Sequence, residues 1–513
     1  MTQNEGPDVA SKVLDRHVLK GAMWSATNTL LMKVANIAVM VIVVRMVTPH
    51  DFGIFAIALV VHAVISSIGE LGLSSCIARR DLDPDKVAPT VFLLSLVSSF
   101  VLALTMAISA EPLAAALGSS EAAEPIRVLA LSVFLGGVFT VPGALLVRDF
   151  RQDKVLLAGG IAFLPMNALL LILAMSGDGA MAFAWSRVAG QLISGIVMAL
   201  SVKLRYWPKL DSAQVVPVLR FGLPLAGANL LSYVLLNADY AIIARSLGPA
   251  ELGIYMLAFT VASWSTSVLS TTINSVAMPA FSARGADTPG LQLMLKRAAT
   301  LVASIAFPIG AMTVALAHPL ISVLYGDAWL RAAPLLSVLA IYGGVFSISL
   351  LLSNILVGTG RSGAVMAVQA LWIASLVPAV ALSVSLSGLI GAAYAHVAVI
   401  IFIVVPAYVF FVRRLLPSAA SFLFVSVRGP LAAAIAAGAC AAGASALTGQ
   451  GIVGLIAGSL AGGSLYTLLM LPTVRGLLPE LPGGKMRRFA EGYDKFHLTA
   501  RTKVSDVRNH YGK

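Results

Sequence analysis

Long apolar windows of about 20 residues follow one another along the chain, separated by short polar or Gly/Pro-containing turns. A helix rises about 1.5 Å per residue, so such a window crosses a hydrocarbon core about 30 Å thick. The windows are too long and too evenly apolar for barrel strands, and a backbone in lipid must satisfy its own hydrogen bonds. The pattern therefore predicts an all-α integral membrane protein with about 14 transmembrane helices. The predicted spans are residues 24–47, 53–75, 88–110, 125–147, 155–176, 180–203, 218–246, 252–279, 298–318, 333–358, 363–386, 388–411, 430–448 and 450–472.

Basic residues concentrate in every second connection between these spans. Arg79 and Arg80 lie in the second connection and Lys203 in the sixth, whereas the third carries Glu111 and Glu121. Cytoplasmic loops keep an excess of Lys and Arg. The alternation therefore predicts that both chain ends lie in the cytoplasm.

Composition supports a lipid environment. Of the 513 residues, 58% are hydrophobic and only 11% are charged, whereas soluble domains carry about 25% charged residues. The net charge of +12 then faces anionic headgroups, and a nucleic-acid partner is not needed to explain it. Cys76 and Cys440 have neither metal-site spacing nor a disulfide framework. The polar first twenty residues show no cleavable signal peptide.

One phrase occurs twice, 200 residues apart. RMVTPHDFGIF (45–55) is repeated as RSLGPAELGIY (245–255), and Val18 and Leu19 match Val218 and Leu219 at the same shift. The first and seventh spans therefore begin two copies of a six-helix unit. Because six is even, the copies run parallel, as in transporters whose site lies between two halves.

This repeat predicts two lobes. The predicted organisation is a cytoplasmic tail (1–23), an N-lobe of helices 1–6 (24–203), a cytoplasmic linker (204–217), a C-lobe of helices 7–12 (218–411), helices 13–14 (430–472) and a basic cytoplasmic tail (473–513). Arg45 and Arg245 lie near the outer ends of their helices. Either they reach the lipid headgroups or they form an outer basic ring for a substrate phosphate.

Polar residues form a stripe on the equivalent first helix of each lobe. At helical spacing on one face, they are Thr29, Lys33 and Asn36 in the first copy and Asn229, Tyr233 and Asn237 in the second. We interpret them as the lining of a cavity between the lobes. The alternative is that they hold helices together by hydrogen bonds.

Ionisable residues inside the spans are costly and therefore candidates for function. Lys33 and Arg187 suit a diphosphate, which Arg binds with bidentate geometry. Asp239 is a candidate for binding a coupling cation, for an ion pair with Arg245 or Lys33, or for a salt bridge between the lobes. Glu70 is a candidate inner gate or an interfacial carboxylate.

Enzyme motifs are missing from the sequence, which contains no P-loop and no HExxH. GTGRSG (358–363) lies on a short predicted turn. His62 and His396 have no second ligand at metal-site spacing. We therefore predict no catalytic residues, no metal and no cofactor, and a gradient or use of the substrate outside would drive the cycle.

Three features together resemble a known family. LGLSSCIARRDL (71–82), the doubled PxxxG turns and LAFTVASWSTSVLSTTINSVAMPAFSARGAD (257–287) resemble the polysaccharide transport family of the multidrug, oligosaccharidyl-lipid and polysaccharide exporter superfamily. Within that family the chain is most similar to bacterial flippases for O-antigen, exopolysaccharide and capsule repeat units. The resemblance covers residues 15 to 470.

The resemblance implies a V-shaped pair of lobes that rock around a basic central cavity. It implies a substrate of oligosaccharide on polyprenyl diphosphate, moved from the inner to the outer leaflet of the bacterial cytoplasmic membrane. Further expected partners are membrane lipids, a polysaccharide polymerase and a coupling cation, H⁺ or Na⁺. A monomer is the default.

Three other functions fit the sequence less well. Drug or cation antiporters of the same superfamily usually have twelve spans and an acidic cavity, and Lys33 and the two extra spans argue against them. A membrane polymerase or glycosyltransferase would need a large outer loop, and the outer connections here are too short. An idle scaffold would not bury costly polar stripes in lipid.

Overall fold

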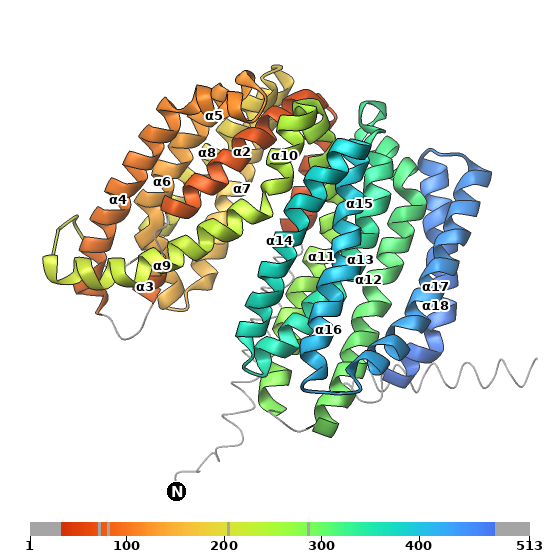
Figure 1. Cartoon of the computed structure of the whole chain (residues 1–513). Helices are drawn as coiled ribbons and strands as arrows, with labels where there is room; N and C mark the ends of the chain where they lie inside the picture. Colours follow the sequence, from red (N-terminus) through yellow and green to blue (C-terminus); the bar gives the residue numbers. More distant parts are fainter. Residues whose placement is uncertain (1–31, 70–72, 79–82, 203–205, 285–287, 478–513) are drawn as a thin grey trace, which may run out of the picture. The chain divides into compact units, whose positions relative to one another are not determined.

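The computed structural model describes residues 32–69, 73–78, 83–202, 206–284 and 288–477 (Figure 1). Within these ranges every regular element is a helix. After an unlabelled helix at Met32–Val44, the helices are α2 (Pro49–Gly69), α3 (Leu73–Ala78), α4 (Pro84–Ile108), α5 (Ala110–Ala116), η1 (Ser120–Ala122), α6 (Ala123–Arg148), α7 (Gln152–Met175), α8 (Gly179–Ser201), α9 (Ser212–Leu236), α10 (Ala238–Leu247), α11 (Pro249–Arg284), α12 (Thr288–Tyr325), η2 (Asp327–Trp329), α13 (Ala332–Gly358), α14 (Ser362–Ser387), α15 (Leu389–Val399), η3 (Ile400–Val404), α16 (Val405–Arg413), α17 (Ala419–Thr448) and α18 (Ile452–Leu477).

The helices have the lengths that a membrane requires. By length and composition, 11 helical segments of the described residues could cross a membrane, and Met32–Val44 is a shorter apolar helix. The all-α, multi-pass membrane architecture is therefore confirmed. The number of about 14 spans stays a prediction.

Local sequence fixes where several helices begin. Pro49 and Pro249 start α2 and α11, where the missing proline N–H costs no helical hydrogen bond. The Asp211 side chain accepts a hydrogen bond from the Ala213 N–H at 3.0 Å and caps α9. Such caps satisfy donors that the first helical turn leaves unpaired.

Two predicted spans are interrupted. The seventh, expected as one helix over 218–246, is divided into α9 and α10 at Asn237, whose backbone is non-helical (φ −117°, ψ 6°). The Asn237 side-chain amide donates to the Tyr233 carbonyl at 2.7 Å. The twelfth contains a π-helical turn, η3, between α15 and α16, and such turns are frequent at functional sites.

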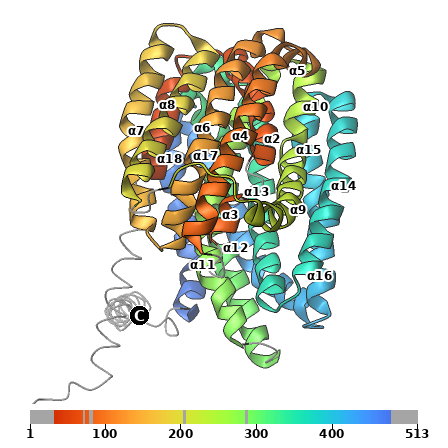
Figure 2. The same cartoon turned by 90° about the vertical axis from the view of Figure 1, so that its left-hand side faces the viewer.

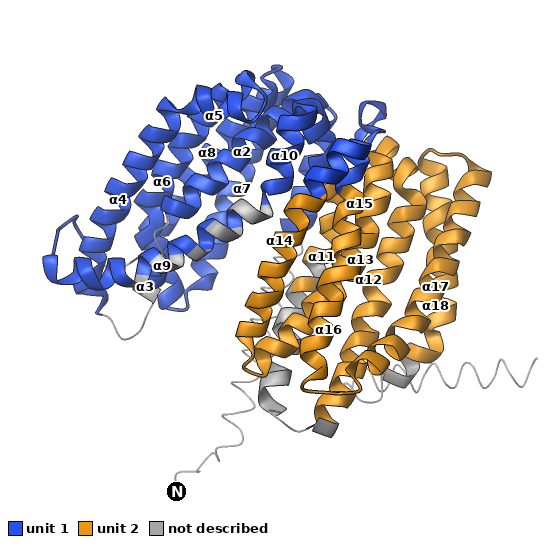
Figure 3. Ribbon diagram, in the orientation of Figure 1, with its two compact units in different colours: residues 1–257, 324–331, 380–392 blue, residues 258–323, 332–379, 393–513 orange. Residues whose placement is uncertain are grey.

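The chain forms two compact units (Figure 3). Unit 1 comprises residues 1–257, 324–331 and 380–392. Within it, α6 packs against α2, α4 and α8, and α2 also contacts α9. Helices α7 and α8 lie side by side as an antiparallel pair (Figure 2).

Unit 2 comprises residues 258–323, 332–379 and 393–513. Its core joins α12, α13, η3 and α16 around buried residues such as Leu295, Leu352 and Ile400. Helices α17 and α18 form a hairpin and pack against each other along their length. The units are defined by packing and the predicted lobes by sequence repetition, so the lobe boundaries stay predictions.

Candidate functional site

The repeated phrase packs against its own copy inside unit 1. A Cβ atom on Gly53 would lie 1.7 Å from the Pro249 carbonyl oxygen, and one on Gly253 would lie 1.9 Å from that of Pro49. Helices α2 and α11 thus cross at a distance that only glycine allows. The two copies of the phrase therefore form one reciprocal contact.

The arginine of each copy binds the end of another helix. Arg45 Nε donates to the Leu324 carbonyl at 2.7 Å, near the end of α12. Arg245 Nη1 donates to the Ala116 carbonyl at 2.8 Å, at the end of α5. Carbonyls at a helix C-terminus carry partial negative charge and attract cations.

A glycine with the same φ angle follows each of these helix ends. Gly118 and Gly326 both have φ of 88°, a left-handed conformation that favours glycine, and each precedes a 3₁₀ turn. We call the reciprocal contact of Gly53 and Gly253, together with the hydrogen bonds from Arg45 and Arg245 to these two helix ends, the helix-end clasp. The clasp gives both arginines structural partners, and a substrate-binding ring at this position stays a prediction.

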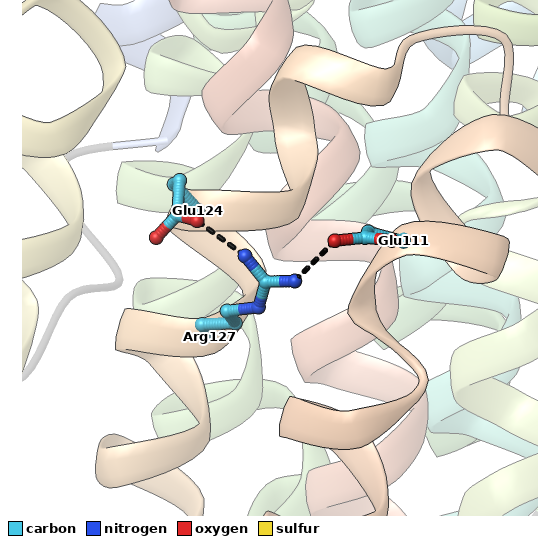
Figure 4. Close-up of polar contacts among 3 residues, drawn as sticks. All are labelled: Glu111, Glu124 and Arg127. Atoms are coloured by element: carbon cyan, nitrogen blue, oxygen red, sulfur yellow. Dashed lines mark hydrogen bonds and ion pairs between the residues drawn. The ribbon is translucent and has the colours of Figure 1, made fainter.

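Acids of the third connection are tied to an arginine nearby in sequence. Arg127 binds Glu111 (Nη2–Oε1, 2.6 Å) and also Glu124 (Figure 4). One guanidinium therefore bridges α5 and α6. This arrangement indicates a structural role for the two glutamates.

Unit 1 contains a pocket of about 760 Å³. It is lined from α2, α3, α4, α6, α8, α9 and α10. Its volume falls in the range of about 300–1,000 Å³ that is typical for small-molecule sites. The pocket therefore has room for a sizeable polar ligand.

The pocket wall is rich in neutral hydrogen-bonding groups. The polar uncharged residues that line it are Ser66, Ser67, Ser74, Ser75, Ser99, Ser132, Thr140, Gln191, Tyr233, Asn237 and Tyr240. Hydroxyls and amides both donate and accept hydrogen bonds. Such a wall matches the hydroxyl groups of a sugar.

One permanent positive charge faces this wall. Arg187 lines the pocket, and its side chain is exposed although α8 is a candidate membrane span. Across the described residues, no carboxylate lines the pocket and Arg187 forms no ion pair. His62, only 7% exposed, places Nε2 3.3 Å from the Ser66 hydroxyl. The described wall is therefore suited to an anion.

Three of the predicted site residues meet in the pocket: Arg187, Tyr233 and Asn237. Lys33, half-buried in the helix Met32–Val44, is not part of its lining. Asn36 and Asn229 also do not line it, and the Asn36 amide donates to the Met32 carbonyl at 2.8 Å.

The remaining predictions concern acids and the start of the chain. Asp239 is buried, 6% exposed, and accepts a hydrogen bond from the Tyr255 hydroxyl at 2.9 Å. Thr29 and Glu70 lie outside the described residues. Their roles stay predictions.

Sequence reasoning did not identify the small polar residues of the wall. On α6, Ser132, Gly136, Thr140 and Ala144 line the pocket at a spacing of four. This places them on one helical face. A stripe of small residues was the available signal, but it also fits close helix packing.

Comparison with known proteins shows the family. Residues 42–334 match the family described as "Polysaccharide biosynthesis protein". The chain belongs to this family. The resemblance found in the sequence is thereby confirmed.

Two relatives of known name align with most of the chain. The "Succinoglycan biosynthesis transport protein ExoT" of Rhizobium meliloti (strain 1021) is 28% identical over 492 residues, which are 93% of this chain and 96% of that protein. The "Lipopolysaccharide biosynthesis protein WzxC" of Escherichia coli (strain K12) is 24% identical over 389 residues, 74% of this chain and 77% of that protein.

Solved structures share the fold at lower identity. The "Lipid II flippase MurJ, inward closed conformation" aligns with a TM-score of 0.71 and 13% identity, covering 89% of this chain and 99% of that chain. An inward-facing multidrug resistance MATE family transporter of the MOP superfamily aligns with a TM-score of 0.60 and 17% identity. The alignment covers 75% of this chain and 94% of that chain. This member of the polysaccharide biosynthesis family thus has a transporter fold.

Proposed function

We propose that this protein is a flippase for lipid-linked oligosaccharides. It moves polysaccharide repeat units on polyprenyl diphosphate from the inner to the outer leaflet by alternating access, for surface polysaccharide synthesis. The observation that carries the proposal is the pocket in unit 1, whose hydroxyl-rich wall surrounds Arg187 inside a multi-pass membrane protein. The family, the transport role in the name of ExoT and the fold of MurJ support it.

The chemistry of the described wall favours a saccharide over a drug cation. The MATE likeness makes ion-coupled export of small solutes the second candidate. The only permanent charge on the described wall is the positive charge of Arg187, which would repel a cationic drug, and no carboxylate of the described wall offsets it.

Reconstituted vesicles test the proposal. Purified protein is placed in vesicles that carry a polyprenyl-diphosphate disaccharide in both leaflets, with and without imposed H⁺ or Na⁺ gradients. Periodate, which does not cross the membrane, oxidises only the outer sugars. We expect the protected sugar to become accessible faster than in protein-free vesicles. If vesicles with the protein and protein-free vesicles show the same rate under every gradient, the proposed function is contradicted.

Orientation follows from the charge pattern. We infer that both ends lie in the cytoplasm, because basic residues fill the even-numbered connections and both tails. A reporter that is active only in the cytoplasm, fused after Lys513, is expected to be active, and one fused in the connection holding Ser119 inactive. The opposite pair of results would break the predicted topology.

Asp239 is proposed as a coupling or gating carboxylate, with Glu70 as a second candidate. Asp239→Asn is expected to remove any dependence of transport on an H⁺ or Na⁺ gradient, because an amide neither binds a proton at neutral pH nor carries charge. Tyr255→Phe removes the hydrogen bond to Asp239 and keeps the carboxylate, so it serves as the matched control. If both variants lose stability equally and keep the gradient dependence, Asp239 is structural.

A further inference from the structure

Unit 2 carries exposed arginines at one end, and its described residues include no Asp or Glu. These exposed residues, which we call the inner arginine cluster, are Arg361, Arg413, Arg414 and Arg428. In unit 1, by contrast, Arg151 pairs with Asp153 and Arg331 pairs with Glu251. The cluster therefore has no carboxylate within the described part of its own unit to neutralise it.

The four arginines come from helix ends that pack together. Arg361 follows the end of α13 by three residues, and Arg413 and Arg414 lie at the end of α16. Helix α16 contacts both α13 and α17, and α17 carries Arg428 in its first third. Figure 1 shows the start of α14 and the end of α16 on the lower side of unit 2. The charge pattern of the connections assigns this end to the cytoplasm.

The turn GTGRSG (358–363) holds Arg361 in place at this end. Gly360 has a φ of 77°, a left-handed conformation that favours glycine after a helix. The Arg361 backbone N–H donates to the Leu356 carbonyl at 2.7 Å, and α14 begins at Ser362. The backbone of the turn is thereby fixed, while Arg361 is exposed.

Helix lengths place the cluster at the level of the lipid headgroups. Arg428 precedes Thr448, the last residue of α17, by 20 residues, which is about 30 Å and matches the hydrocarbon core. The segment Leu389–Arg413 has 25 residues and is about 37 Å long. With their outer ends at the outer boundary of the core, both helices bring arginines to its inner boundary.

Aromatic side chains accompany the arginines. The Arg414 Cζ lies 4.6 Å from the centroid of the Phe410 ring and 5.6 Å from that of Phe411. Phe410 is 55% exposed, and Phe424, which is 69% exposed, precedes Arg428 by one helical turn. A ring face holds a guanidinium in position, and a guanidinium binds phosphate through two parallel hydrogen bonds. The pairing suits a ligand with a phosphate beside apolar chains.

We propose that the inner arginine cluster binds the phosphate of an anionic phospholipid from the cytoplasmic leaflet. Acyl chains next to that phosphate contact Phe410 and Phe424. A soluble acidic partner would not need these exposed rings, so the surface favours a lipid. The site lies in unit 2, outside the pocket of unit 1, and the proposal is independent of the substrate that the pocket takes.

The test measures the thermal midpoint of the full chain in detergent micelles that contain increasing fractions of phosphatidylglycerol or of phosphatidylcholine. One triple variant changes Arg413, Arg414 and Arg428 to Gln, and a second changes them to Lys. The matched control changes Lys86, Arg151 and Lys154 to Gln. It removes the same charge from the cytoplasmic side of unit 1, where Lys86 pairs with Asp83 and Arg151 with Asp153.

We expect phosphatidylglycerol to raise the midpoint of wild-type protein to a plateau, and phosphatidylcholine to leave it unchanged. The glutamine triple variant should need about tenfold or more phosphatidylglycerol for half of the effect, with a wild-type midpoint in phosphatidylcholine. The lysine variant should fall between them, because it keeps the charge and loses the planar fork. Phe410→Leu keeps every charge and should weaken binding about two- to fivefold.

Three results would overturn the proposal. An unchanged phosphatidylglycerol response in the glutamine variant would remove the cluster from lipid binding. An equal loss in the unit 1 control would show general electrostatic attraction and no site. Stabilisation by a polyprenyl diphosphate alone, lost in the glutamine variant, would assign the cluster to that diphosphate. If the glutamine variant does not fold, wild-type responses of both the lysine variant and Phe410→Leu would refute the site.

Discussion

Replacing Gly53 with valine is expected to remove most of the folded protein from the membrane. The Cβ of any other residue would meet the Pro249 carbonyl oxygen at 1.7 Å, and that oxygen belongs to backbone that cannot rotate away. Helices α2 and α11 would have to separate, at a cost of about 3 kcal/mol or more. The measurement is the folded fraction after detergent extraction, by size-exclusion profile and thermal midpoint.

Gly159→Val is the matched control for this change. Gly159 lies on α7 with no heavy atom within 4 Å of an added Cβ, so valine there should leave the folded fraction near wild type. Gly253→Val should reproduce the defect, since its Cβ would meet the Pro49 oxygen at 1.9 Å. The double variant should be hardly worse than either single one, because both disturb one crossing. A normal amount of folded Gly53→Val protein would refute the clasp.

Replacing Gly136 with leucine is expected to abolish most transport while the protein stays folded. Gly136 lines the pocket, and its nearest neighbour to an added Cβ is Gln191 Nε2 at 4.0 Å, an ordinary contact. A leucine side chain would therefore fit the helix packing and occupy space meant for the ligand. Pocket changes of about one methylene alter specificity about 10–200-fold, so a loss of about tenfold or more is expected.

This prediction separates the pocket from general stability. Gly159→Leu makes the same change on an exposed face of α7 and should leave transport and thermal midpoint unchanged. Gly136→Ala adds only the Cβ and should retain most transport. If Gly136→Leu is folded and transports at the wild-type rate, the pocket in unit 1 is not the substrate site.

The helical architecture could be predicted because apolar length is read directly from the sequence. The doubled phrase is also visible in the sequence, because Gly53 and Gly253 recur at one spacing. Their close contact explains why both copies have a glycine at this position. Arg187 was identified because a guanidinium inside an apolar window is conspicuous. Each of these features is visible in the sequence as a short pattern of residue types.

Other features depend on tertiary packing and could not be predicted. Asn237 was expected to line a cavity between the lobes. It lines the pocket of unit 1, and nothing in the sequence indicates that its helix breaks there. The wall residues of α6 were missed because small residues fit both a pocket and a close helix contact. Lys33 and Arg187 were expected to act together on a diphosphate, yet only Arg187 lines the pocket.

The central claim is tested most directly in cells depleted of this protein. Polyprenyl-diphosphate oligosaccharides are extracted, the glycan is identified, and its leaflet is determined from intact and broken vesicles with periodate. The account predicts that a complete repeat unit accumulates in the inner leaflet. Normal surface polysaccharide with no accumulated lipid-linked saccharide would contradict it and favour export of another solute.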